Sequence, residues 1–320
     1  WLKGYTSQGQ YSSLHSDLAH LSAAIGLAMV AYPNYVTWKV ANLAPHVLGV
    51  ELDYPKVNAM NNQFWEDVRD LFERIDNDHA TRVVVLSAAG RMFTAGLDLG
   101  TAGQELAGVQ PMEGVASAVD LARKALNIRR IGKAWQQSFT NIERCGKPVI
   151  ACVHNGCIGG GIEMISACDV RFCTEDAYFV MAEVSIGLAA DVGGLQRFPK
   201  ILGSQSLVRE LALSGRRMDA KEAFHHGFVS RILDDKGKMM EAAVELAKAI
   251  AAKSPVATLG VKHFLNYTRD HSVDESLDYA ITWNMGMLQG EDMKLAAMSM
   301  MQKKTPVFPD LPQVEAKSKL

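Results

Sequence analysis

The chain has 320 residues, of which 48% are apolar and 21% are charged, and its formal net charge is −2 at pH 7. This composition is that of a folded globular protein, and it excludes the disordered, collagenous and coiled-coil classes. The near-neutral charge argues against a nucleic-acid partner. No apolar run approaches the ~18 residues of a membrane-spanning helix, so we expect no membrane span. The five cysteines lack the spacing of a zinc site, so we expect reduced thiols and no metal.

The first part of the chain combines an extension with the start of an alternating pattern. Residues 1–45 carry only weak signals, and we expect an N-terminal extension there. Residues 46–52 and 82–87 are apolar runs typical of strands. Between them, residues 62–77 have apolar side chains at helical spacing, and the asparagines at their start can cap a helix.

The alternation continues through the middle of the chain. A long amphipathic helix is expected over residues 115–144, followed by a strand over 148–154. A further helix opens at 159–167, and short strands follow at 170–173 and 178–180. Strands that alternate with helices indicate an α/β architecture with crossover connections.

Beyond Pro255 the pattern is only helical and rich in methionine. Helices are expected over residues 256–267, 273–288 and 292–302. Such a region could cover a site, form a subunit interface, or pack as a layer on its own core. The sequence therefore predicts an extension, a core, a helical region and a tail, at residues 1–45, 46–253, 254–310 and 311–320.

Two loops contain glycines that would leave backbone N–H groups free to bind a ligand. Each loop follows a predicted strand. They span residues 92–99 and 154–163, and the second contains three consecutive glycines before a predicted helix. Glycines at such a turn leave backbone N–H groups unobstructed, and the helix adds the positive end of its dipole. The turn therefore suits an anion, or an oxygen that becomes anionic. It has neither the Lys-Ser/Thr of a phosphate-binding loop nor the GxGxxG of a dinucleotide site.

Three acidic residues lie close to these loops in apolar or glycine-rich sequence. They are Glu163, directly after the glycines, Glu183, and Asp191. Carboxylates in apolar surroundings have raised pKa values and can exchange protons near neutral pH. Each one by itself is more often a solvated or ion-paired acid. Together, beside a turn that suits an oxyanion, they predict a catalytic site.

These loops resemble those of a known family. The segments FTAGLDL (93–99) and CIGGGIE (157–163) resemble the paired oxyanion-hole loops of the crotonase, or enoyl-CoA hydratase/isomerase, superfamily, and the resemblance extends over residues 46–288. The glycine-rich segment around Asp191 is most similar to the Δ3,5-Δ2,4-dienoyl-CoA isomerases. The resemblance implies a core of ββα superhelical turns with a C-terminal helical region, assembled as a homotrimer or homohexamer.

The resemblance also implies a reaction. The backbone N–H groups of Ala95 and Gly160 would hold the thioester oxygen, while Glu183 and Asp191 move protons between C2 and C6. A 3,5-dienoyl-CoA of fatty-acid β-oxidation would thereby become a 2,4-dienoyl-CoA, with CoA as part of the substrate and no separate cofactor. Lys56 is a candidate contact of the CoA phosphates, with a solvated surface lysine as the equal alternative. The implied substrate-binding residues are Ala95, Gly96, Leu97, Asp98, Leu99, Gly160 and Gly161.

One position leaves the reaction open. The isomerases that the chain resembles usually have Asp where it has Glu163. Glu163 with Glu183 forms the paired-glutamate pattern of the enoyl-CoA hydratases, in which two carboxyl groups activate a water. We therefore expect an isomerase, with a hydratase as the alternative. A non-catalytic binder of acyl-CoA or RNA is less favoured, because it would not need three acids at one site.

The sequence ends in a targeting signal. Ser318, Lys319 and Leu320 form the SKL tripeptide that a peroxisomal import receptor reads at a free C-terminus. The sequence therefore predicts a peroxisomal protein, with the mitochondrion as the alternative that the family allows. The plain alternative for the tripeptide is a polar, frayed tail.

Overall fold

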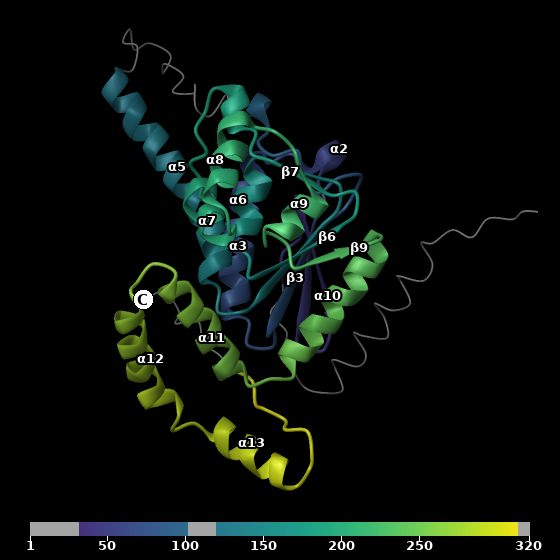
Figure 1. Ribbon diagram of the computed structural model, residues 1–320, viewed down its shortest axis with the longest axis vertical. Coiled ribbons are helices and arrows are strands. Elements are labelled where there is room, and N and C mark those ends of the chain that lie inside the picture. The colour runs from purple at the N-terminus through teal and green to yellow at the C-terminus, as the bar shows by residue number, and fades with distance from the viewer. Residues whose placement is uncertain (1–31, 102–119, 313–320) are drawn as a thin grey trace, which may run out of the picture. The chain divides into compact units, whose positions relative to one another are not determined.

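The computed structural model describes residues 32–101 and 120–312. Its main sheet has six strands in the order β1-β2-β3-β4-β6-β9 (Figure 1). The first two strands are antiparallel and every later neighbour is parallel. The strands are β1 Trp38–Ala44, β2 Val47–Leu52, β3 Val83–Ala88, β4 Val149–Val153, β6 Val170–Thr174 and β9 Arg231–Leu233.

The first strand corrects the predicted boundary at residue 45. β1 pairs along its length with β2, with Trp38 opposite Leu52 and Val40 opposite Val50. The core therefore includes residues that the sequence assigned to the extension. β1 was missed because it is an edge strand whose exposed positions break the apolar pattern. Residues 1–31, the first residues of the predicted 115–144 helix, and the SKL tripeptide lie outside the described part of the chain.

The alternation of side chains along β3 builds a core on each face of the sheet. Val83 and Val85 pack on the side covered by α10 (Lys236–Ala251). Val84 packs in the larger cluster on the other face, which includes α3 (Asn62–Asn77). Figure 1 shows these helices on opposite sides of the strands. Burial on both faces explains why the strand reads as a continuous apolar run.

Helices α3 and α5 (Leu121–Arg144) lie together over the second face. α3 begins as predicted, because Asn61 Oδ1 accepts a hydrogen bond from the Phe64 N–H over 2.9 Å. The indole rings of Trp65 and Trp135 stack between the two helices with their centroids 5.0 Å apart. Only the second half of α5 is buried, and its first half keeps apolar side chains in solvent.

A smaller sheet and a set of short helices follow the main strands. The sheet has the order β5-β7-β8 and carries one of the two glycine loops. All five cysteines are buried and free, as expected for reduced thiols. The remaining elements of this part are β5 Gly156–Ile158, β7 Tyr178–Val180, β8 Met218–Asp219, α6 Gly160–Ser166, η1 Glu183–Ile186, α7 Gly194–Ile201, α8 Gln205–Ser214 and α9 Ala220–His225.

The C-terminal region is helical, as predicted. α11 (Pro255–Thr268) leads to α12 (Val273–Met287) and α13 (Glu291–Met301), and neither α12 nor α13 contains a buried residue. Figure 1 shows α12 and α13 apart from the helices that cover the sheet. The chain then returns to the core, where the Arg82 guanidinium donates to the Phe308 carbonyl oxygen over 2.7 Å. In the described part of the chain, no helix combines the length and the apolar character that crossing a bilayer requires.

Candidate active site

The two glycine loops meet through backbone hydrogen bonds. The Thr94 N–H donates to the Gly156 oxygen over 3.0 Å, and the Ile158 N–H donates to the Thr94 oxygen over 3.1 Å. Thr94 and Cys157 thereby form a parallel bridge between segments that are distant in the sequence. The structure therefore brings together the two loops that the sequence singled out.

The closeness of the loops requires glycine. Gly96 has a φ of +83°, and a Cβ atom there would lie 2.7 Å from the Ile158 carbonyl oxygen. A Cβ atom on Gly161 would lie 2.4 Å from Thr94 Cγ2. Both distances are shorter than real Cβ contacts, so the two backbones can approach this closely only because these positions have no side chain.

A pocket opens beside this contact. It is lined by Ala95, Gly96, Leu97 and Leu99 of the first loop and Gly160 of the second, five of the residues that the resemblance implied for substrate binding. Trp135 lies in the helix predicted over residues 115–144, and an apolar helix face does not distinguish a core position from a pocket wall. The apolar side chains that complete the wall are Met60, Trp65, Trp135, Ile158, Ile186 and Leu188.

The structure corrects one of the two predicted backbone donors. The Ala95 N–H already donates to the Val57 carbonyl oxygen over 2.9 Å, so it is not available to a substrate. Among the described residues, the N–H groups of Leu97 and Gly160 have no protein acceptor, and both residues line the pocket. The two N–H groups that are free in the pocket are therefore those of Leu97 and Gly160. A sequence motif does not show in which direction an N–H group points, which is why the first donor was misassigned.

Three other predicted binding residues lie outside the pocket lining. Gly161 packs beneath the turn, and Asp98 Oδ1 accepts a hydrogen bond from the Gly100 N–H over 3.0 Å. Asp98 and Gly161 therefore shape the loops and do not line the pocket. Lys56 is exposed in the short segment α2 (Pro55–Asn58), and its contact with CoA stays a prediction.

Glu163 is buried in the wall of the pocket, with 3% of its surface exposed. Its Oε1 atom accepts hydrogen bonds from the N–H groups of Val192, over 3.2 Å, and Gly194, over 2.9 Å. Burial, and then the nearby charge of Glu183, raise the pKa of Glu163 to about 8. The side chain therefore holds a proton at neutral pH and ties the backbone after Asp191 to α6.

Glu183 and Asp191 line the same pocket at different depths. Glu183 is 7% exposed, and its Oε1 atom would lie 3.0 Å from a Cβ atom on Gly159, so it adjoins the triglycine turn. Burial, and then the charge of Asp191, raise the pKa of Glu183. Asp191 reaches solvent, and partial burial raises its pKa as well. All three predicted acids therefore share one pocket with the two free N–H groups.

The sequence as a whole is similar to proteins of one family. Residues 44–311 match the enoyl-CoA hydratase/isomerase family. The chain is 51% identical to the mitochondrial Delta(3,5)-Delta(2,4)-dienoyl-CoA isomerase of Mus musculus over 272 residues, which are 85% of this chain and 81% of the mouse protein. It is 38% identical to the peroxisomal Delta(3,5)-Delta(2,4)-dienoyl-CoA isomerase of Arabidopsis thaliana over 255 residues, 80% and 89% of the two chains. This chain belongs to the enoyl-CoA hydratase/isomerase family.

A solved structure of the enoyl-CoA hydratase/isomerase family has the same fold. The crystal structure of an enoyl-CoA hydratase from Bacillus anthracis matches with a TM-score of 0.74 and 25% identity. The match covers 85% of this chain and 99% of that chain. It confirms the crotonase-like α/β core with its C-terminal helices. Among the described residues, no group of three or more His, Cys, Asp and Glu side chains is arranged to hold a metal ion.

The contact between the loops generates a stability prediction. We expect Gly96→Ala to lower the free energy of unfolding by about 1–3 kcal/mol, because its φ is positive and its Cβ would overlap the Ile158 carbonyl. Gly132→Ala is the matched control. Gly132 lies in α5, and a Cβ atom there would meet nothing within 4 Å. This control should be neutral or stabilise by up to about 1 kcal/mol. Denaturant unfolding measures both, and equal effects would contradict the close loop contact.

The raised pKa of Glu163 generates a pH prediction. Between its ordinary value of 4.5 and about 8, the unfolded chain loses this proton while the folded chain keeps it, so the folded state becomes less favourable as pH rises. Glu163→Gln removes this effect and keeps an oxygen for the two N–H groups. Its free energy of unfolding relative to wild type should rise by up to about 1.4 kcal/mol per pH unit across this window.

Unfolding at several pH values between 5 and 8 measures this difference. Glu241→Gln, on the exposed side of α10, controls for the loss of one carboxylate. A difference between Glu163→Gln and wild type that stays constant with pH would show that Glu163 is ionised in the folded protein.

Proposed function

We propose that this protein isomerises 3,5-dienoyl-CoA to 2,4-dienoyl-CoA in fatty-acid β-oxidation. The observation that carries the proposal is a pocket that contains two free backbone donors together with Glu163, Glu183 and Asp191. The relatives described above, at 38% and 51% identity, are named for the same reaction. An isomerisation over this distance needs an acid or base at each end of the diene, and the pocket supplies both.

The chemistry proceeds through an enolate. A base removes the proton at C2, and the electron pair moves into the thioester and the conjugated double bonds. The N–H groups of Leu97 and Gly160 stabilise the oxygen that becomes negative, by about 3–4 kcal/mol for each donor in comparable sites. An acid then delivers a proton to C6, which places the double bonds at positions 2 and 4. No proton is gained or lost overall.

The depths of the two acids suggest their roles. Glu183 adjoins the turn that carries the Gly160 donor, so it lies near C2, the carbon next to the thioester carbonyl. Asp191 is the solvent-exposed acid of the same pocket, and it is the group then left for C6. The raised pKa values of both groups favour proton exchange at neutral pH. We therefore propose Glu183 as the base at C2 and Asp191 as the acid at C6.

The alternative function is hydration of a 2-enoyl-CoA by a water held between Glu163 and Glu183. Two observations weigh against it as the main reaction. One oxygen of Glu163 is already occupied by the N–H groups of Val192 and Gly194, which leaves it fewer positions for holding a water. Asp191 adds a third carboxyl group that hydration does not use. Hydration is therefore proposed only as a side reaction.

Asp191 distinguishes the two reactions. We expect purified wild-type protein to convert 3,5-dienoyl-CoA with a rise in conjugated-diene absorbance, faster than it hydrates 2-enoyl-CoA. Asp191→Asn should lower isomerase turnover by about 10²- to 10⁴-fold, because it removes one of the two proton-transfer groups. Its rate of hydration should change by less than about tenfold. Rapid hydration without a diene signal, or equal losses in both assays, would contradict the proposal.

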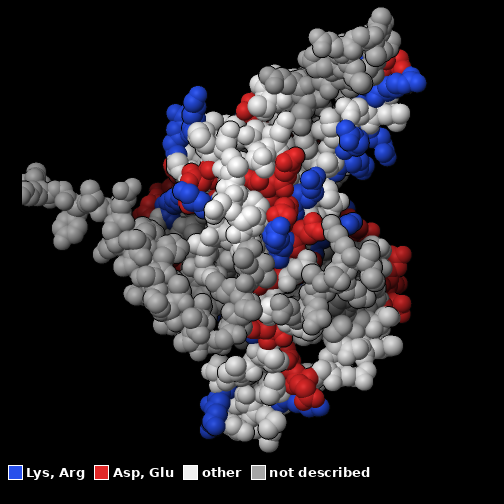
Figure 2. All heavy atoms as spheres, turned by 180° about the vertical axis from the view of Figure 1, so that it is seen from behind, with Lys and Arg blue, Asp and Glu red and all other residues white. Residues whose placement is uncertain are grey.

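A non-catalytic binding protein is a weaker alternative. Figure 2 shows acidic and basic side chains interspersed over the middle of one face, with basic side chains gathered at one end over α5. An acyl-CoA carrier has no use for three acids of raised pKa around one pocket. Measured turnover of the dienoyl substrate would directly exclude a non-catalytic acyl-CoA carrier.

The cellular location is a separate proposal. The mouse relative is named mitochondrial and the Arabidopsis relative peroxisomal. We favour the peroxisome because Ser318, Lys319 and Leu320 form an import signal. A fluorescent reporter that ends in residues 313–320 should collect in peroxisomes, and the same reporter without the last three residues should stay diffuse. Mitochondrial staining of the full chain, or unchanged puncta after the deletion, would overturn this assignment.

Assembly as a homotrimer or homohexamer is also proposed. It is supported by α12, where Leu277, Ile281 and Met285 recur every fourth residue, and each is more than half exposed. Such a face is typically covered by protein. Light scattering should give three or six times the chain mass, and Ile281→Asp should lower it. A monomeric mass for the wild-type protein would contradict the proposal.

A further inference from the structure

The segment that carries Asp191 needs support from its neighbours. It runs through Val192 and Gly193 to Gly194, the first residue of α7, and Gly193 has a φ of +126°. Glycines leave such a segment free to adopt many conformations. The Asp191 carboxyl group must nevertheless keep one position, because a proton-transfer group that moves by about 1 Å can lose two orders of magnitude in rate.

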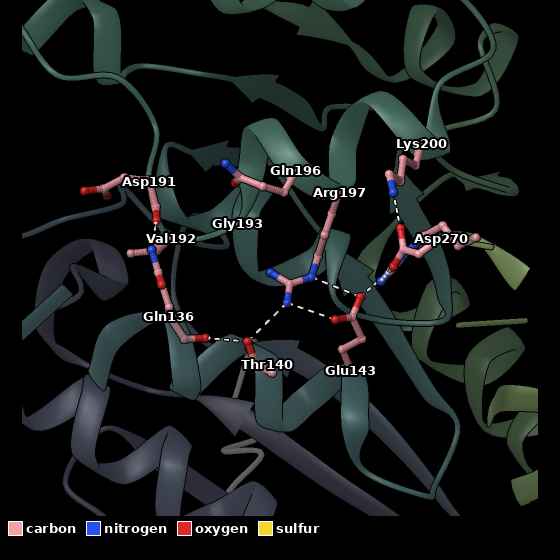
Figure 3. A pocket seen from close by; sticks show the side chains of 11 residues that line it. Gln136, Thr140, Glu143, Asp191, Val192, Gly193, Gln196, Arg197, Lys200 and Asp270 are labelled. Atoms are coloured by element: carbon pink, nitrogen blue, oxygen red, sulfur yellow. Dashed lines mark hydrogen bonds and ion pairs between the residues drawn. The ribbon is translucent and has the colours of Figure 1, made fainter. Parts of the chain in front are cut away.

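One face of α5 contacts the segment from Asp191 to Gly194 and the start of α7. Gln136, Thr140 and Glu143 follow each other at intervals of four and three residues, so they lie on one side of the helix. Gln136 Nε2 donates to the backbone oxygen of Asp191 over 2.7 Å. Figure 3 shows this bond, with the Asp191 carboxyl group turned away from the ionic cluster.

The other two residues of the face hold the start of α7. The Arg197 guanidinium contacts Glu143 through two hydrogen bonds, of 3.0 and 2.9 Å, and Thr140 Oγ1 over 3.3 Å (Figure 3). A Cβ atom on Gly193 would lie 2.0 Å from Arg197 Nη1, so the arginine packs directly under the segment. Arg197 and Glu143 are almost buried, which makes this contact rigid compared with a surface ion pair.

Gln136 differs from the other supports of the segment. The N–H of Val192 belongs to the same peptide group as the Asp191 oxygen, and both it and the N–H of Gly194 donate to Glu163, while Arg197 packs on Gly193. Among the hydrogen bonds of the described residues, the bond from Gln136 is the one that the Asp191 backbone oxygen accepts. Its loss would leave the segment held by Glu163 and Arg197, but would remove one of the two hydrogen bonds that orient this peptide group.

We propose that Gln136 is a positioning residue that fixes Asp191 for proton transfer, by means of its hydrogen bond to the Asp191 backbone oxygen. This inference rests on the proposed isomerase function. Gln136 does not touch the reacting carbons, so it acts through Asp191. The thioester contacts at Leu97 and Gly160 do not involve it, so its loss should affect kcat and leave KM within about twofold.

A double-mutant cycle tests this dependence. Gln136→Met keeps the length of the side chain and removes the donor. It should lower the kcat for 3,5-dienoyl-CoA by about 10- to 100-fold in the wild-type background. In the Asp191→Asn background the same change should lower the residual kcat by less than about twofold, because the group that Gln136 positions no longer transfers a proton.

Two further variants separate positioning from a general structural effect. Gln136→Lys retains a donor at this place and should recover most of the lost kcat. Gln137→Met is the matched control, since Gln137 is the exposed neighbour on α5 and its side-chain amide donates to Asn141 Oδ1 instead of to the Asp191 segment. It should leave kcat unchanged. Thermal unfolding of each variant shows whether the protein remains folded.

The outcomes are distinct. A loss that is equal in the two backgrounds, an effect on KM instead of kcat, or a Gln136→Met variant as active as wild type would overturn the positioning role and leave the isomerase function intact. Wild-type protein without diene formation, or an Asp191→Asn variant with full activity, would overturn the proposed function and the positioning role with it.

Discussion

The structure depends on one backbone contact, the pairing of Thr94 with the segment from Gly156 to Ile158. Two hydrogen bonds of 3.0 and 3.1 Å join loops that follow different strands of the main sheet. Glycines at positions 96 and 161 remove the side chains that would force the loops apart. This contact places the free N–H groups of two loops in one pocket, where we propose that they bind the thioester oxygen.

The position of each acid in the pocket determines its burial, its hydrogen bonds and therefore its pKa. Glu163 lies deepest and is bound to backbone N–H groups, Glu183 adjoins the triglycine turn, and Asp191 lies at the rim. Burial raises the pKa of all three, and it raises that of Glu163 to about 8. Glu163 binds the neighbouring segment through two backbone N–H groups, and we propose the other two acids as the groups that exchange protons. Chemically similar residues thereby take different roles.

The sequence predicted most of the elements, because apolar periodicity and glycine-rich turns are local signals, and the three acids it singled out line one pocket. It missed β1, an edge strand, and assigned Ala95 as a donor although the Ala95 N–H binds Val57. Hydrogen-bond direction depends on tertiary contacts that a motif does not contain. The same limit applies to Gln136, which looks like any exposed helix residue until its contact with Asp191 is known.

In the proposed mechanism, one thioester oxygen lies between two backbone donors. A crystal structure of the protein with a bound 2,4-dienoyl-CoA measures this directly. We expect the thioester oxygen at hydrogen-bond distance, about 2.7–3.1 Å, from both the Leu97 and Gly160 nitrogens, with C2 near Glu183 and C6 near Asp191. A thioester oxygen bound elsewhere, or an acyl chain that leaves the pocket without passing between these two acids, would contradict it.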